Sequence, residues 1–241
     1  MGAVRMSKQK MTLVMTNVFY RLGQAILITV GWVVGFEVVV SLMGLGFNHN
    51  LESFLVTLQA IPSTLAVFIN LILFAYFIVT PYVDFKWAIQ NGISRKTMWR
   101  GRALALFLAT LVIFILDELL SLANQPAMSP RTLLVNFLIL LTVVVTCQAI
   151  GNGFGLLSRT WKWIVGIGLP VMFIILCVML GRLMLTLNNQ ITALVENKQF
   201  VTAMAIVFNN PVIPYVLWLV YFAIVLGLTK LFNDRLQLRR D

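Results

Sequence analysis

The stretch TLAVFINLILFAYFIVT, residues 64–80, contains no charged side chain and no alternation of polar with apolar residues. Residues 164–180, IVGIGLPVMFIILCVML, have the same character. A backbone that crosses hydrocarbon must satisfy its own hydrogen bonds, as a helix or as a closed barrel, and the strands of a barrel alternate in polarity. The two stretches therefore predict transmembrane helices.

The composition supports the same fold class. Hydrophobic residues make up 60% of the chain and charged residues 11%, against about 45–50% and about 25% in soluble domains. The net charge of +10 does not indicate a nucleic-acid partner, because the basic residues lie between apolar stretches rather than in one polar domain. We expect the lipid bilayer to be the surroundings of most of the chain.

Six segments are long enough to cross a membrane as helices. A hydrocarbon core of about 30 Å requires about 20 helical residues. The expected spans are 22–45, 61–83, 103–122, 133–157, 163–187 and 212–231. The sequence thus predicts an all-α integral membrane protein with six transmembrane helices in one domain that covers residues 1–241.

Basic residues are distributed unequally between the two sides of these spans. Of the 18 Lys and Arg residues, only Arg131, Arg182 and Lys198 fall on the side opposite the N-terminus. Since cytoplasmic loops carry an excess of Lys and Arg, both termini are expected in the cytoplasm, with residues 232–241 as a cytoplasmic tail. We expect a multi-pass protein of a bacterial plasma membrane.

Two further helices are expected outside the spans. Residues 1–21 contain an apolar stripe at helical spacing, which predicts an interfacial amphipathic helix on the cytoplasmic leaflet: Met11, Val14, Met15 and Val18. The connection between the last two spans contains a largely apolar stretch, 200–208, which is too short to cross. A re-entrant or surface helix is expected there.

The connection between the second and third spans has the most distinctive pattern. Residues 84–99 read DFKWAIQNGISRKTMW. Gly92 suits the left-handed backbone conformation that follows the C-terminus of a helix, and Ser94 suits the N-cap of the next helix. An ordinary basic loop with a well-formed turn is the alternative. One face of the short helix before the turn is apolar, through Phe85, Ala88 and Ile89.

The segment Gly92-Ile93-Ser94-Arg95-Lys96, after a short amphipathic helix and between spans two and three, resembles permeases of the ABC-2-type exporter superfamily. The resemblance covers the architecture of the whole chain. It implies that the short helix is a coupling helix that docks on an ATPase subunit. The contact residues that it implies are Phe85, Ala88, Ile89, Gly92, Ser94 and Arg95.

The resemblance also implies the partners: an ABC ATPase subunit and a second permease copy, identical or similar. Span one lies near the permease dimer interface in that family, so Gly31 and Gly35 are candidate dimer contacts, and packing within one subunit is the alternative. No phosphate-binding loop of the form GxxxxGK[ST] is present in the sequence. We therefore expect no cofactor on this chain, with ATP and magnesium bound by the ATPase.

Charged residues inside membrane spans are rare and usually face a partner or an aqueous path. Four occur here, all in the outer halves of their spans: Glu37, Asp117, Glu118 and Arg182. One interpretation is an ion pair between Arg182 and Asp117 or Glu118. The other is an acidic lining for an outward path or for a cationic substrate, with Glu37 the strongest candidate.

A membrane-embedded enzyme is one alternative to an exporter subunit. Intramembrane metalloproteases and serine proteases require a histidine within the spans, and the single histidine of the sequence, His49, lies in the first outer loop. The chain is therefore not expected to be an enzyme. An ATP-independent secondary transporter and a membrane immunity or scaffold protein remain as alternatives.

Overall fold

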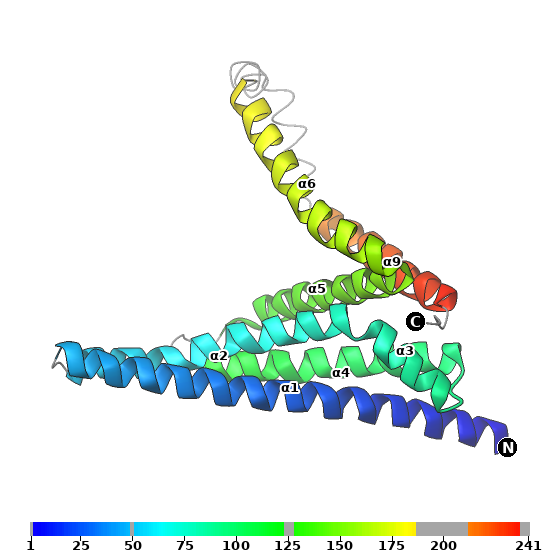
Figure 1. The fold of residues 1–241 in the computed structure, drawn as a ribbon, viewed down its shortest axis with the longest axis horizontal. Coiled ribbons are helices and arrows are strands. Elements are labelled where there is room, and N and C mark those ends of the chain that lie inside the picture. Colours follow the sequence, from blue (N-terminus) through cyan, green and yellow to red (C-terminus); the bar gives the residue numbers. More distant parts are fainter. Residues whose placement is uncertain (1, 49–50, 123–127, 187–211, 237–241) are drawn as a thin grey trace. The chain divides into compact units, whose positions relative to one another are not determined.

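A computed structural model describes residues 2–48, 51–122, 128–186 and 212–236. Every regular element in these ranges is an α-helix, which confirms the predicted all-α class (Figure 1). The helices are α1 (Gly2–Asn48), α2 (Leu51–Val79), α3 (Pro81–Gln90), α4 (Arg95–Ser121), α5 (Pro130–Leu156), α6 (Arg159–Thr186) and α9 (Val212–Arg235).

Five helices in the described ranges are long and apolar enough to cross a membrane, which supports a transmembrane chain. Their membrane-length segments are Lys8–Gly46, Phe54–Val79, Arg95–Ser121, Pro130–Leu156 and Tyr215–Arg235. They match five of the six predicted spans. The remaining prediction, 163–187, falls on the 28-residue helix α6 and one residue beyond it. The helix predicted around 200–208 lies outside the described residues.

The chain divides into two compact units, where the sequence predicts one domain. The first unit comprises Met1–Gly155 together with Leu228–Asp241, and the second comprises Leu156–Gly227. The first unit therefore contains α1 to α5 and the end of α9. The second contains α6 and the beginning of α9, where the ring of Trp218 stacks on that of Phe222 with centroids 5.2 Å apart.

The N-terminal helix differs from its prediction. Instead of an interfacial helix over 1–21 followed by a separate span, α1 is one continuous helix of 47 residues. Val14, Val18 and Leu22, spaced by four residues, are almost fully buried. The apolar stripe is therefore used for packing within the protein.

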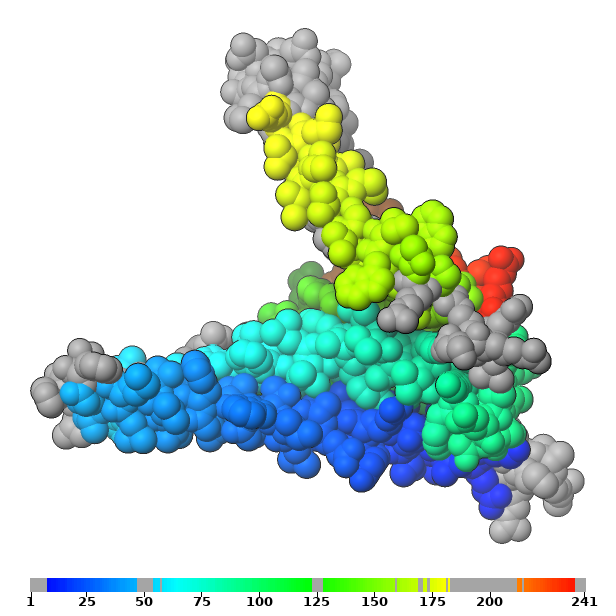
Figure 2. Space-filling model, in the orientation of Figure 1, coloured from blue at the N-terminus to red at the C-terminus, as the bar shows by residue number. Residues whose placement is uncertain are grey.

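The contacts of this stripe lie on α4 and α2. A Cβ atom placed at Gly101 of α4 would lie 3.0 Å from the Cβ of Val14. The Tyr76 hydroxyl of α2 donates a hydrogen bond to the Val18 carbonyl oxygen at 3.4 Å. Figure 2 shows α1 and α2 forming one continuous surface. A stripe with a period of 3.6 residues has the same sequence pattern whether it meets a lipid surface or another helix, which explains the misassignment.

The helix α5 packs through glycine. A Cβ at Gly151 would lie 2.7 Å from the Phe77 carbonyl oxygen of α2, and one at Gly155 would lie 2.9 Å from the side chain of Leu236. Both glycines are buried. The small-x-x-x-small spacing of these residues thus corresponds to close helix packing.

Candidate functional site

Residues 80–97, which we call the elbow, join α2 to α4. Helix α2 ends at Val79, and Pro81 begins α3 in the first-turn position that proline tolerates. Figure 1 shows α3 leaving the line of α2 at an angle. The predicted span 61–83 therefore ends earlier than expected.

The turn between α3 and α4 has the predicted conformation. Gly92 has a φ of 62°, and the two hydrogen bonds of a Schellman motif are present: Ile93 N–H to the Ala88 carbonyl at 2.9 Å and Gly92 N–H to the Ile89 carbonyl at 3.0 Å. Ser94 then caps α4, because its hydroxyl oxygen accepts a hydrogen bond from the Thr97 N–H at 3.3 Å. Both ends of the turn are thus fixed.

The turn is also attached to distant parts of the chain. The Lys10 ammonium of α1 donates a hydrogen bond to the Gly92 carbonyl oxygen at 2.6 Å. The Arg95 guanidinium donates to the Asp234 carbonyl oxygen at 2.8 Å, and the Asn233 amide donates to the Arg95 carbonyl oxygen at 3.4 Å. Displacement of the turn would therefore act on α1 and on the end of α9.

A buried ion-pair cluster connects the elbow to α1 and α4. Asp84 of α3 is 3% exposed and accepts hydrogen bonds from two arginines. The Arg21 Nη1 atom lies 2.9 Å from its Oδ1 atom, and the Nη1 atom of Arg102 contacts its Oδ2 atom. Arg102 also donates to the Thr80 hydroxyl at 2.8 Å and lies over the ring of Phe77. The cluster links α1, α3 and α4.

Sequence reasoning missed this cluster. Its members are 18 and 63 residues apart, so no local pattern connects them. One signal was available: Asp84 is the only acidic residue among the five basic residues of the connection between the second and third spans. A single carboxylate among bases next to a membrane span indicates an ion pair.

The predicted ATPase-contact residues divide into buried and exposed groups. Phe85 and Ala88 are 0% exposed, and Ile89 is partly exposed. The guanidinium of Arg95 lies over the Phe85 ring, 5.6 Å from its centroid. Two of the three predicted residues of the apolar face of α3 are thus packed within their own unit. The exposed residues near the turn are Gln90, Asn91, Gly92, Ser94, Arg95 and Lys96.

The other end of α4 carries two carboxylates in a different environment. The Asn70 amide of α2 donates a hydrogen bond to the Asp117 Oδ2 atom at 2.6 Å. The Oδ1 atoms of both side chains are buried without a hydrogen-bond partner in the described part of the chain. Asn70 is a partner that the sequence did not reveal.

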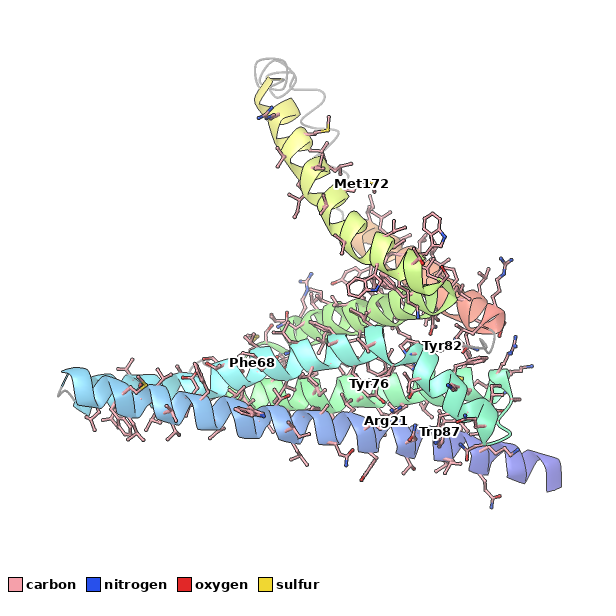
Figure 3. All side chains as sticks on the ribbon, viewed as in Figure 1. Arg21, Phe68, Tyr76, Tyr82, Trp87 and Met172 are labelled. Atoms are coloured by element: carbon pink, nitrogen blue, oxygen red, sulfur yellow. The ribbon has the colours of Figure 1, made fainter. Side chains whose placement is uncertain are left out.

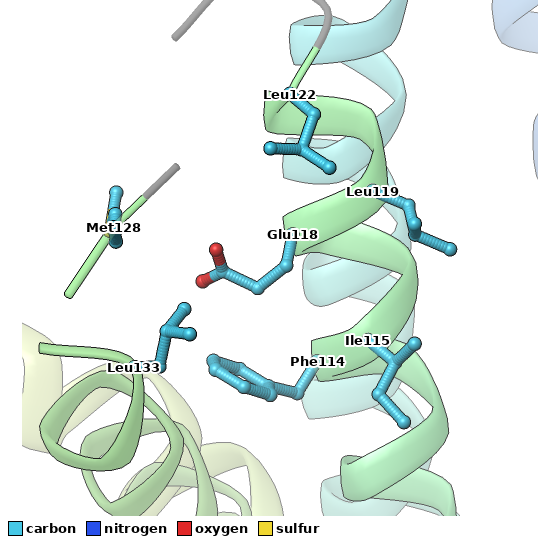
Figure 4. Close-up of a pocket in the computed structure, with 7 residues that line it drawn as sticks. All are labelled: Phe114, Ile115, Glu118, Leu119, Leu122, Met128 and Leu133. Atoms are coloured by element: carbon cyan, nitrogen blue, oxygen red, sulfur yellow. The ribbon is translucent and has the colours of Figure 1, made fainter. Parts of the chain in front are cut away.

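Glu118 lines a pocket of about 340 Å³ between α4 and α5 (Figure 4). The carboxylate points toward the space bordered by Phe114, Met128 and Leu133, and it is the one charged group among the described lining residues. An apolar pocket with a single carboxylate is suited to a lipophilic cation. This fits the interpretation of an acidic lining, which stays a prediction.

The other charged residues predicted within spans, and the two predicted dimer-contact glycines, lie on α1 and α6. Glu37 is partly exposed on α1, and Arg182 is exposed on α6 in the second unit. Pairing of Arg182 with Asp117 or Glu118 would join the two units and stays a prediction. Gly31 and Gly35 are exposed, and a Cβ at either position would meet nothing within 4 Å in the described structure. Their role in dimer contact also stays a prediction.

Comparison of the chain with models of protein families, with curated proteins and with solved structures finds no match. The fold and the site therefore define the class of protein by themselves. That class is an all-helical chain with membrane-length helices, a fixed elbow and carboxylates at the opposite end of α4.

Proposed function

We propose that the chain is the membrane-spanning permease subunit of an ATP-driven exporter of the ABC-2 type. It would work with a separate ATPase subunit and pair with a second permease copy. In this proposal α6 is the fifth of six spans, and both termini are cytoplasmic. The elbow is the observation that carries the proposal.

The elbow has the dimensions and the stiffness that coupling requires. Helix α3 has 10 residues, about 15 Å, which is too short to cross a bilayer, yet it separates two membrane-length helices. Its turn is fixed by a Schellman motif and by the Ser94 cap. A rigid segment of this kind transmits displacement, whereas a flexible loop would absorb it.

The contacts of the elbow supply routes for that displacement. Movement of the turn would reach α1 through Lys10, and movement of α3 would reach α1 and α4 through the two arginines on Asp84. Binding of ATP by the partner would therefore reposition helices of the membrane region. Outward passage of the substrate would follow, along a path that includes Asp117 and Glu118.

The burial of Phe85 and Ala88 revises the surface that docks on the ATPase. These two buried side chains pack α3 against its own unit. The ATPase would instead contact Ile89 and the exposed residues of the turn. Fifteen of the 18 basic residues, including those of the elbow, would lie on the cytoplasmic side, where the ATPase would dock.

Cross-linking in native membranes tests this proposal. A single cysteine at Asn91, in a chain without other cysteines, is expected to cross-link to an ATPase subunit through a short bifunctional reagent. A cysteine at Ser129, which is exposed beyond the other end of α4, serves as the control and should give no such product. Impermeant thiol reagents should label the two positions from opposite sides of the membrane. Labelling of both from outside would contradict the topology.

One observation favours an ATP-independent transporter as the second candidate. Asp117 lies in a membrane-length helix with one buried oxygen atom that has no partner in the described residues, and such carboxylates occur in proton and cation relays. Vesicles that contain the purified chain alone distinguish the two. Ion-driven substrate movement without an ATPase would favour this candidate.

A further inference from the structure

A pocket of about 450 Å³ lies between α1 and α3 in the first unit. Two cations, Arg21 and Lys86, and two aromatic residues, Tyr20 and Trp87, contribute to its lining. Figure 3 labels Arg21 and Trp87, which lie at the same end of the unit. Arg21 belongs to the ion-pair cluster through its contact with Asp84, and the pocket lies outside the site described above.

The charge of the pocket is positive. No acidic residue is among the described residues that line it, and Asp84, which pairs with Arg21, is 3% exposed with both oxygens occupied by arginine nitrogens. Lys86 is exposed and forms no hydrogen bond or ion pair with another described residue. Amide groups from Gln24 and Gln90 add hydrogen-bond donors. The pocket therefore suits an anion.

The position of the pocket relative to the membrane-length helices identifies the kind of anion. Its α3 wall begins at Val83, four residues after Val79, the last residue of the second membrane-length segment. Its α1 wall lies near the beginning of the segment Lys8–Gly46, which at 39 residues is about twice the length that a bilayer requires. Tyr and Trp are enriched at such membrane boundaries. On α1, Leu27 and Ile28 lie seven and eight residues beyond Tyr20, on the same helix face, and are 73% and 63% exposed. An apolar strip thus continues from the pocket into the span.

We propose that this pocket binds the phosphate-bearing headgroup of an anionic phospholipid, with an acyl chain along Leu27 and Ile28. Basic pockets between helices at the cytoplasmic boundary are typical headgroup sites. A lipid fits better than free phosphate, because free phosphate would make no use of the apolar strip. The proposal is independent of the ATPase: it requires only that the elbow lies at the anionic leaflet.

Occupancy of the pocket would affect the elbow. The headgroup would contact α1 and α3 simultaneously, through Arg21 and Lys86. Since Arg21 also holds Asp84, a bound lipid would add a second connection across the same pair of helices. The lipid would therefore stabilise the arrangement of α3 against α1.

Lipid titration of the purified full chain in detergent tests the proposal. The probes are short-chain phosphatidylglycerol, phosphatidylcholine of the same chain length, and inorganic phosphate, with binding measured by native mass spectrometry. One phosphatidylglycerol per chain is expected, bound about 25-fold more tightly than phosphatidylcholine, because each of two cations near an anionic lipid contributes about fivefold. Inorganic phosphate should not compete at the same concentration.

Two lysine variants separate the pocket from general surface charge. Lys86→Gln should weaken phosphatidylglycerol binding about fivefold. The matched control is Lys96→Gln, which removes the same charge from an exposed site outside the pocket and should leave the affinity unchanged. Lys86→Arg keeps the charge and should bind as the unmodified chain does, which guards against a folding defect in Lys86→Gln.

Four results would overturn the proposal. Equal weakening by Lys86→Gln and Lys96→Gln would mean diffuse surface attraction. Equal affinity for phosphatidylcholine would mean that the headgroup charge is not recognised, and competition by inorganic phosphate would mean a site for a free anion. Absence of lipid binding, together with a change of oligomeric state in Lys86→Gln, would mean that a second copy of the chain fills the pocket.

Discussion

Helix α4 carries charged side chains near both of its ends, and their partners differ between the two ends. Near its beginning, Arg102 is buried against Asp84, whose two oxygens both accept from arginines. Near its other end, about 22 Å further along the helix, Asp117 has a neutral amide as its partner, and Glu118 faces an apolar pocket. Among the described residues of the first unit, Asp84 has an arginine on each oxygen, whereas Asp117 and Glu118 have no cationic partner.

The difference separates a structural role from a chemical one. A buried ion pair with complete partners fixes the helices that carry it, although it is weak evidence of net stability. A carboxylate without a cationic partner inside a membrane-length helix is unfavourable and usually marks a path or a binding site. In the proposed function, the Asp84 cluster would position the elbow, and Asp117 and Glu118 would face the substrate.

Loss of the Asp84 carboxylate is the change with the largest expected effect. Asp84→Ala leaves two arginines without their partner, one of them fully buried, so the free energy of unfolding should fall by about 3–5 kcal/mol. Thermal unfolding in detergent measures it. Asp234→Ala, at an exposed carboxylate, is the control and should change stability by less than about 0.5 kcal/mol. Equal effects of the two substitutions would contradict the structural role of the cluster.

Strain at the turn should have the next largest effect. Gly92→Val places a β-branched residue at a φ of 62°, which should lower the free energy of unfolding by about 1–3 kcal/mol. The matched control is Gly92→Asn, since asparagine tolerates the left-handed region. The same unfolding assay applies. If the valine variant were as stable as the asparagine variant, the turn would not be the rigid part of the elbow.

Neutralisation of Asp117, near the C-terminal end of α4, should have the smallest effect on stability and a large effect on transport. Asp117→Asn removes an incompletely paired charge, so the free energy of unfolding should change by less than about 1 kcal/mol, in either direction. Substrate movement into vesicles should decrease. A loss of stability as large as that of Asp84→Ala would show that both ends of α4 are structural, and the comparison would fail.

The sequence predicted those features that depend on local patterns. The uninterrupted apolar stretches identified the long helices, and Gly92 and Ser94 identified the turn, because a cap is formed by residues within a few positions of one another. The predicted bounds of α4 began later, at 103, because the charged first turn of that helix resembles a loop in composition.

Tertiary contacts were not predictable in the same way. The apolar stripe of α1 and the apolar face of α3 were both assigned to surfaces outside the chain, a membrane leaflet and an ATPase. In the structure, Val18 and Phe85 are 0% exposed within their own unit. Periodicity reveals that a helix has an apolar face, and it does not reveal what covers that face. The same limit hid the Asn70 partner of Asp117.

Co-purification with an ATPase tests the central claim most directly. The chain, isolated from its native membranes, is expected to carry an ATP-hydrolysing subunit. Ile89→Asp puts a charge at the partly exposed position beside the turn, and it should weaken the association with the ATPase by roughly 3 kcal/mol. Membrane insertion and the unfolding temperature should not change. Val83→Asp, the same kind of change on the α3 side that lines the lipid pocket, should retain the subunit. A wild-type chain that never co-purifies with an ATPase, or an Ile89→Asp chain that binds it as tightly as wild type, would contradict the account.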